Sequence, residues 1–181
     1  MPGYHEHDGF YMRLLLGVGY LHSSASYQGD SMAVSGVGVT MGAAFGGALT
    51  PNLIIYGEFV GTIVSDPTLE YNGQSGTASG LTASMMGFGP GIAYYIDPNL
   101  YFSGTLLFTR LSFSDSNSNE DVASTDLGFG AGFTVGKEWW ISRDWGIGLA
   151  GQFMVASMKD KDVDTRWTGL SGSLLFSATY N

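Results

Sequence analysis

The feature of this sequence that most limits its possible folds is an alternation of large apolar residues with small or polar ones, repeated along almost the whole chain. In the segment 127–136, Leu127, Phe129, Phe133 and Val135 alternate with glycine and threonine. Successive side chains of a β-strand point to opposite faces, so this period of two predicts strands with one large apolar face and one small face. Eight strands are predicted, over residues 10–21, 33–45, 53–64, 81–95, 100–113, 126–139, 145–157 and 167–180.

The connections between these strands alternate in length. Long polar segments (22–31, 65–80, 114–125 and 158–166) alternate with short ones (46–52, 96–99 and 140–144). Pro51-Asn52 and Pro98-Asn99 lie in two of the short connections and have the composition of tight turns. This pattern is typical of an up-and-down barrel. We therefore predict one all-β domain, an eight-stranded antiparallel up-and-down barrel over residues 10–181, preceded by a tail of residues 1–9.

Composition excludes several other classes. The chain has 28 glycines, 14% aromatic residues and no cysteine, which favours strands over helices and leaves no thiol chemistry. A net charge of -9 disfavours nucleic acid as a partner. Residues 1–9 lack the basic and apolar regions of a secretory signal, so we interpret them as part of the mature chain.

The two faces of the predicted barrel indicate its solvent. The large apolar side chains are too bulky and too numerous to fill the interior of eight strands, so they are expected to face lipid. The opposite face carries glycine, serine, threonine and a few charges, and is expected to face the lumen. Because an open sheet edge cannot be satisfied in hydrocarbon, the barrel has to close. We predict a transmembrane barrel in a Gram-negative outer membrane, with short periplasmic turns, long extracellular loops and both termini periplasmic.

Two alternatives are weaker. The uncharged segments 31–57 and 71–96 are long enough for membrane helices, and Gly38, Gly42 and Gly46 form a GxxxG pattern. Glycine and serine are too dense there, the apolar period is two, and no Lys or Arg flanks either segment. A soluble lipocalin-like barrel would place Lys and Glu on its outer face, which here is almost free of charge.

Aromatic residues gather near the predicted strand ends, where membrane barrels carry interfacial girdles. The girdle predicted at the short-turn end consists of Phe10, Tyr94, Tyr95, Trp139, Trp140, Trp145 and Tyr180. The girdle predicted at the long-loop end consists of Tyr20, Phe113 and Trp167.

The predicted lumen holds three charges, Arg13, Glu58 and Glu138, all in the periplasmic half. A buried charge without a partner is expensive, so we predict an internal salt-bridge network in which Arg13 is shared between the two carboxylates. Hydrogen-bonding neighbours would be Tyr11, Tyr56 and Gln152. This network would plug the barrel. The inward glycines provide little side-chain volume, so a narrow water-filled channel is the alternative.

The whole chain resembles the small outer-membrane β-barrel proteins of the OmpA/OmpX transmembrane type. The eight strands and the last-strand residues Leu174, Phe176, Ala178 and Tyr180 carry the resemblance, although such proteins usually end in Phe or Trp and this chain ends in Tyr180-Asn181. The resemblance implies insertion by the barrel-insertion machinery, surroundings of outer-membrane lipid and lipopolysaccharide, and an extracellular partner at the loops. The family includes adhesins, anchors, small channels and a few enzymes, so the fold alone does not choose among them.

We expect a structural or surface-interaction role without catalysis, with a small passive pore as the alternative. A lipid A-modifying enzyme ranks third: lipid A deacylases use His and Ser on a similar barrel, and His22, Ser23 and Ser24 follow the first strand, but no acidic residue stands at a compelling spacing. Asp160, Asp162 and Asp164 lack calcium-loop spacing. No metal or cofactor is therefore expected.

Overall fold

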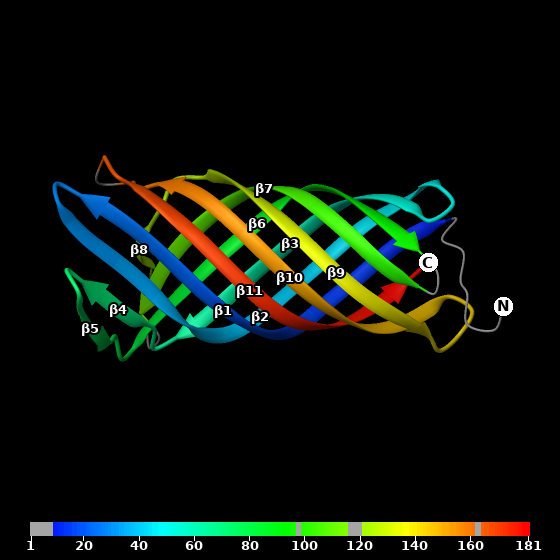
Figure 1. The fold of residues 1–181 in the computed structure, drawn as a ribbon, viewed down its shortest axis with the longest axis horizontal. Coiled ribbons are helices and arrows are strands. Elements are labelled where there is room, and N and C mark those ends of the chain that lie inside the picture. The colour runs from blue at the N-terminus through cyan, green and yellow to red at the C-terminus, as the bar shows by residue number, and fades with distance from the viewer. Residues whose placement is uncertain (1–8, 97–98, 116–120, 162–163) are drawn as a thin grey trace.

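The computed structural model describes residues 9–96, 99–115, 121–161 and 164–181. The strands are β1 (Phe10–Tyr27), β2 (Asp30–Thr50), β3 (Leu53–Ser65), β4 (Thr68–Tyr71), β5 (Gln74–Thr77), β6 (Leu81–Ile96), β7 (Leu100–Asp115), β8 (Asp121–Ser124), β9 (Gly128–Trp140), β10 (Trp145–Lys159) and β11 (Arg166–Tyr180) (Figure 1). No helix in the described part of the chain is long and apolar enough to cross a membrane.

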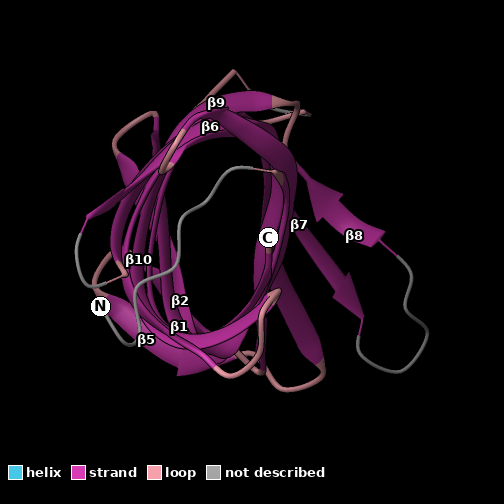
Figure 2. Ribbon diagram, turned by 90° about the vertical axis from the view of Figure 1, so that its right-hand side faces the viewer, coloured by secondary structure: helices cyan, strands magenta, loops and turns pink. Residues whose placement is uncertain are grey.

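Eight long strands close into a barrel. Their order around the wall is β1-β11-β10-β9-β7-β6-β3-β2, and β2 pairs with β1 to complete the ring (Figure 2). Every pairing is antiparallel; Leu16 on β1, for example, pairs with Met41 on β2 and with Phe176 on β11. The prediction of an eight-stranded antiparallel up-and-down barrel is confirmed.

The alternation in the sequence becomes an alternation of exposure. Large outward side chains are exposed, up to 78% for Leu174 and 72% for Phe129, whereas inward neighbours such as Leu175 and Thr134 are buried. So wide an apolar outer surface is far larger than a water-soluble monomer exposes, and it matches the lipid-facing band of a membrane barrel.

The long polar connections contain more strand than the sequence predicted. Most of the segment 22–31 continues β1 and β2 up to a two-residue turn at Gln28-Gly29, where both residues have positive φ, 51° and 98°. The segment 65–80 holds the β4–β5 hairpin, which pairs with β2, and the segment 114–125 includes β8, which pairs with β7. At the other end, residues 46–50 also belong to β2. The predicted bounds of these connections were too wide because they followed side-chain polarity, whereas backbone groups pair wherever a neighbouring strand is available.

The barrel has two distinct ends. One end, called here the terminal end, holds the start of β1, the end of β11 and the tight connections after β2, β6 and β9 (Figure 1). The other end, called here the hairpin end, holds β4, β5 and β8 and extends beyond the ring (Figure 1). The N-terminal residues 1–8, predicted as a tail, lie outside the described residues.

Candidate functional site

The interior of the barrel is the candidate site, and inward side chains occupy it in three successive layers. A layer rich in tyrosine lies toward the terminal end, a layer of hydroxyl groups lies in the middle, and an apolar layer lies toward the hairpin end. All six side chains predicted to form the polar network are buried in the interior: Arg13, Glu58, Glu138, Tyr11, Tyr56 and Gln152.

Arg13 is at the centre of the tyrosine-rich layer and is fully buried. Its guanidinium carbon lies 4.5 Å from the ring centroid of Tyr101, 5.7 Å from that of Tyr56 and 5.8 Å from that of Tyr11. Its Nη2 also donates a hydrogen bond to Ser103 Oγ, at 3.4 Å. The charge is therefore stabilised by aromatic faces, an arrangement that is worth more when it is desolvated.

The predicted salt bridges are absent. Among the described residues, no carboxylate lies within ion-pairing distance of Arg13. The reason is geometric: Arg13 extends across the lumen to Ser103 on β7, and tyrosine rings surround its guanidinium. The prediction that Glu58 and Glu138 share Arg13 was wrong.

Each carboxylate has neutral donors instead. Glu58 accepts hydrogen bonds from Thr105 Oγ1 at 2.6 Å and from Gln152 Nε2 at 3.4 Å. Gln152 Nε2 also lies 3.1 Å from Thr134 Oγ1. Glu138 Oε1 accepts from Thr179 Oγ1 at 2.7 Å and from Tyr95 Oη at 3.1 Å. Hydrogen bonds to a charged group are the stronger kind, so these contacts offset part of the cost of burial.

Four buried polar atoms of this layer form no hydrogen bond with the described residues. Nε and Nη1 of Arg13, Oη of Tyr101 and Oε2 of Glu138 have no hydrogen-bond partner among them. These groups remain available to further donors or acceptors in the barrel interior.

Two tyrosines of this layer were missed or misplaced from the sequence. Tyr101 was not predicted as a lumen residue, and Tyr95 was assigned to a girdle, yet both are buried and their ring centroids lie 5.3 Å apart with the ring planes tilted by 41°. Strand parity predicts that both tyrosines face inward, because consecutive residues of a strand point to opposite faces. Tyr101 precedes the outward Phe102, and Tyr95 follows the outward Tyr94.

Glycines on neighbouring strands make room for two of the tyrosine rings. A Cβ on Gly91 would lie 2.4 Å from the ring of Tyr56, its partner across the β3–β6 ladder. A Cβ on Gly136 would lie 2.4 Å from the ring of Tyr101, its partner across the β7–β9 ladder. Two of the inward glycines that suggested an empty channel are thus covered by tyrosine side chains.

The middle layer is a chain of hydroxyl groups. Thr40 Oγ1 lies 2.8 Å from Thr62 Oγ1 and 2.8 Å from Ser173 Oγ, and Thr62 Oγ1 lies 2.9 Å from Ser171 Oγ. Gly19 on β1 provides the space for this chain, since a Cβ there would meet both Thr40 and Ser173.

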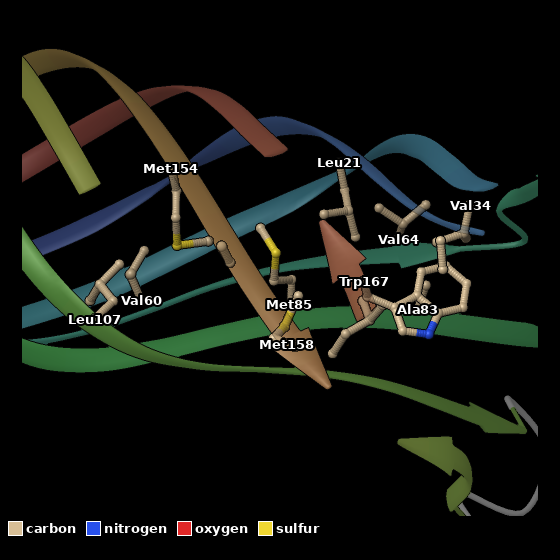
Figure 3. Close-up of a cluster of buried hydrophobic side chains, with 13 residues drawn as sticks. Leu21, Val34, Val60, Val64, Ala83, Met85, Leu107, Met154, Met158 and Trp167 are labelled. Carbon is tan, nitrogen blue, oxygen red and sulfur yellow. The ribbon is translucent and has the colours of Figure 1, made fainter. Parts of the chain in front are cut away.

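The third layer is apolar, and Figure 3 shows its side chains converging from several strands. Its buried members are Leu21, Ala25, Val34, Val60, Val64, Ala83, Met85, Leu107, Leu111, Met154, Ala156, Met158 and Trp167. Met85 reaches across the lumen to the backbone of Gly169, where its Sδ would lie 2.6 Å from an added Cβ. Methionine is suited to filling such irregular space.

The predicted aromatic girdles divide into two groups. Outward and exposed positions are held by Phe10, Tyr20, Tyr94, Trp139 and Trp145, and Tyr180 packs its ring against Phe10 and Trp145. Inward positions are held by Tyr95, Trp140, Phe113 and Trp167, and for these the girdle prediction was wrong.

The physical reason is the period of two. Trp139 and Trp140 are consecutive on β9, so when Trp139 faces outward Trp140 faces inward, where it packs over Gly146. Trp167 packs against Phe113 in the apolar layer, and its Nε1 donates to Asp160 Oδ2 at 2.9 Å.

Groups from opposite walls of the barrel meet at three places. β1 and β7 are diametrically opposed in the ring, as are β3 and β10, and β6 and β11, since three strands separate each pair in both directions. The contacts are Arg13 with Ser103, Glu58 with Gln152, and Met85 with Gly169. The lumen is therefore bridged across its full width in both its terminal and its hairpin half.

The weakly supported catalytic and metal candidates do not come together. Ser23 points inward and donates to the carbonyl oxygen of Thr168 at 3.3 Å, whereas His22 and Ser24 occupy the outward positions of β1. Asp160 accepts from Trp167 and Asp164 pairs with Lys159, while Asp162 lies outside the described residues. No group of three or more His, Cys, Asp or Glu that would hold a metal occurs within the described ranges.

Comparison with known proteins supports the fold. No family model and no curated protein matches the sequence. Neisserial surface protein A superposes with a TM-score of 0.62 at 16% identity, covering 94% of this chain and 96% of that one. The outer-membrane protein OprG from Pseudomonas aeruginosa gives a TM-score of 0.56 at 11% identity, covering 99% and 98%. The chain has the fold of the small eight-stranded outer-membrane β-barrels, the class to which the OmpA/OmpX transmembrane type belongs.

Proposed function

We propose that this protein is a non-conducting, non-catalytic outer-membrane barrel that holds its hairpin end outside the cell as an interaction surface. In this orientation both termini are periplasmic, as the rule of short periplasmic turns and longer external connections requires. Outer-membrane lipid and lipopolysaccharide would surround the barrel, and the barrel-insertion machinery would recognise the last strand, β11.

The observation that carries this proposal is the contact between opposite walls of the lumen. Arg13 with Ser103 and Glu58 with Gln152 bridge it on the periplasmic side, and Met85 against Gly169 bridges it on the external side. An ion moving past Met85 would also have to lose its water in an apolar layer, which is very costly. This arrangement favours the plugged barrel over the passive pore.

Hydrogen bonds hold the β4–β5 hairpin against the β1–β2 turn at the hairpin end. Asp30 accepts hydrogen bonds from Tyr71 Oη and Asn72 Nδ2, both at 2.8 Å, and the amide of Ser31 donates to Asn72 Oδ1 at 2.9 Å. These contacts tie the tip of the β4–β5 hairpin to the β1–β2 turn. Leu69 and Tyr71 remain 40% and 52% exposed there, so the hairpin offers one apolar and one aromatic side chain to a partner.

Single-channel recording in planar lipid bilayers tests the proposal. Refolded protein should give no discrete conductance steps. A comparison variant, Met85→Gly with Leu107→Gly, removes two side chains of the apolar layer and should give brief conductance steps that the unchanged protein lacks. Stable, discrete channels in the unchanged protein that respond to Glu58→Gln or Arg13→Ala would instead assign the pore function. Release of fatty acid from lipid A would assign an enzyme.

A further inference from the structure

The basic residues of the barrel wall are distributed unevenly. β2, β3 and β6 contain no Lys or Arg, and β1 contains only the inward Arg13. Three outward basic residues lie at the hairpin end of the opposite wall, namely Arg110 on β7, Lys159 on β10 and Arg166 on β11. We propose that this basic wall, Arg110, Lys159 and Arg166, binds the phosphate groups of an outer-leaflet glycolipid of the lipid A class.

The central pair of this wall is unusual for a β-ladder. Lys159 and Arg166 are direct cross-strand partners and share the outer face. Like charges placed directly opposite each other destabilise a sheet unless an anion compensates them. Arg166 has no carboxylate partner among the described residues; its Nη1 lies 3.4 Å from Ser157 Oγ, which leaves most of its donors available.

Lys159 forms an ion pair with Asp164, at 3.0 Å. Both side chains of this pair are largely exposed, 56% and 91%, so the pair contributes little and a phosphate can replace the carboxylate. A second carboxylate, Asp126, lies near Lys159, since its amide donates a hydrogen bond to the Lys159 carbonyl oxygen, and its side chain is exposed. A phosphate carries more charge and more acceptor oxygens than either carboxylate, and Arg binds it in a bidentate way.

The height of the basic wall matches a headgroup layer. Val155 and Leu170 form the last outward apolar pair of the β10–β11 ladder, Ser157 and Thr168 form the next outward pair, and Lys159 with Arg166 follows. Four residues at about 3.4 Å each, on strands tilted by about 40°, raise the cations about 10 Å above that apolar pair. The headgroup region is about 5–8 Å thick, and long basic side chains can bend toward it.

Hydroxyl groups complete the wall. Ser157 and Thr168 lie between the apolar belt and the cations, and Arg110 Nη2 donates to Ser124 Oγ at 2.8 Å. The site is assigned to the outer leaflet because it lies at the hairpin end. This assignment rests on the orientation given under the proposed function.

Native mass spectrometry of the detergent-solubilised barrel, titrated with lipid A in EDTA, tests this inference. Unchanged protein should bind bis-phosphorylated lipid A at least about tenfold more tightly than dephosphorylated lipid A. Lys159→Gln combined with Arg166→Gln should lose about tenfold in affinity. Lys137→Gln, which removes an outward charge at the terminal end, is the matched control and should change affinity by less than about twofold.

Three results would overturn the inference. Equal binding of dephosphorylated lipid A would assign the contact to acyl chains. Equal competition by phosphatidylglycerol would show a general lipid-phosphate site. If EDTA abolishes binding and the double substitution does not, the lipid is held by a metal ion that bridges its phosphates to carboxylates of the protein. Because the assay is done in detergent and measures no conductance, its failure is distinguishable from failure of the non-conducting function.

Discussion

Glu58 on β3 and Gln152 on β10 lie on diametrically opposite walls of the barrel, yet Gln152 Nε2 donates a hydrogen bond to Glu58 Oε1 at 3.4 Å. The bond spans the whole lumen between the tyrosine-rich and hydroxyl layers. A passage for water or ions along the barrel axis would have to separate these two side chains. Their contact supports the proposal that the interior is a packed core rather than a pore.

The Glu58–Gln152 contact should contribute measurably to stability. Gln152→Ala leaves Glu58 Oε1 without this donor inside the barrel, and a buried charged group that loses a partner costs about 1–3 kcal/mol. Urea unfolding in phospholipid vesicles, followed by tryptophan fluorescence, measures the loss. Gln74→Ala on the exposed strand β5 is the control and should be neutral within about 0.5 kcal/mol. Equal effects of the two substitutions would contradict the bridged lumen.

Two tyrosines of the same layer should respond differently to loss of the hydroxyl group. Tyr95 Oη donates to Glu138, so Tyr95→Phe should cost about 1–3 kcal/mol of unfolding free energy. Tyr101 Oη has no partner among the described residues, so Tyr101→Phe should be neutral or slightly stabilising. Tyr101→Leu removes the ring nearest Arg13 and should cost more than Tyr101→Phe. A larger loss for Tyr101→Phe than for Tyr95→Phe would contradict the hydrogen-bond assignment.

The glycines beneath the tyrosine rings should not tolerate a methyl group. Gly136→Ala places a Cβ against Tyr101, and overpacking of this kind costs about 1–3 kcal/mol. Gly57→Ala adds a methyl group where nothing lies within 4 Å, so it serves as the control. Combining Gly136→Ala with Tyr101→Leu should cost less than the sum of the two, because the second change removes the clash. Additive losses in this double-mutant cycle would show that ring and glycine are not coupled.

The tip of the hairpin end should loosen in acid. Hydrogen bonds from Asn72 and then Tyr71 hold the pKa of Asp30 below its ordinary value of 3.8. A carboxylate whose pKa is lowered by folding adds stability above its unfolded pKa, and this stability is lost as the pH falls through the folded value. The protection of the Ser31 and Asn72 amides, that is their exchange rate relative to the intrinsic rate at the same pH, should therefore be constant above about pH 5 and weaken in more acidic solution. Asn72→Ala should remove most of this pH dependence; a profile unchanged by that substitution would place its cause elsewhere.

The barrel could be predicted from the sequence because the alternation of large apolar residues with small or polar ones runs through each of its eight long strands. Parity alone assigned Arg13, Glu58 and Gln152 to the inner face, and the structure buries all three. The aromatic residues at strand ends follow the same parity, so Trp140 and Trp167 face inward although their position at strand ends predicts girdles.

The partners of Arg13 were beyond the reach of sequence reasoning. Counting charges suggested carboxylates, but the choice depends on which side chains meet across the lumen. Tyr101 comes from the β7 wall opposite Arg13, and its ring is held in place by Gly136 on the next strand. Such contacts follow from the strand register around a closed ring, which no local pattern in the sequence encodes.

Thiol accessibility tests the filled lumen most directly, because the chain contains no native cysteine. Thr62→Cys places a thiol in the hydroxyl layer at the middle of the barrel, and Ser75→Cys places one on exposed β5. In reconstituted vesicles, a small membrane-impermeant thiol reagent should label Ser75→Cys rapidly and leave Thr62→Cys unmodified when added to either side. Labelling of Thr62→Cys at a rate close to that of Ser75→Cys would show an open water path and contradict the account.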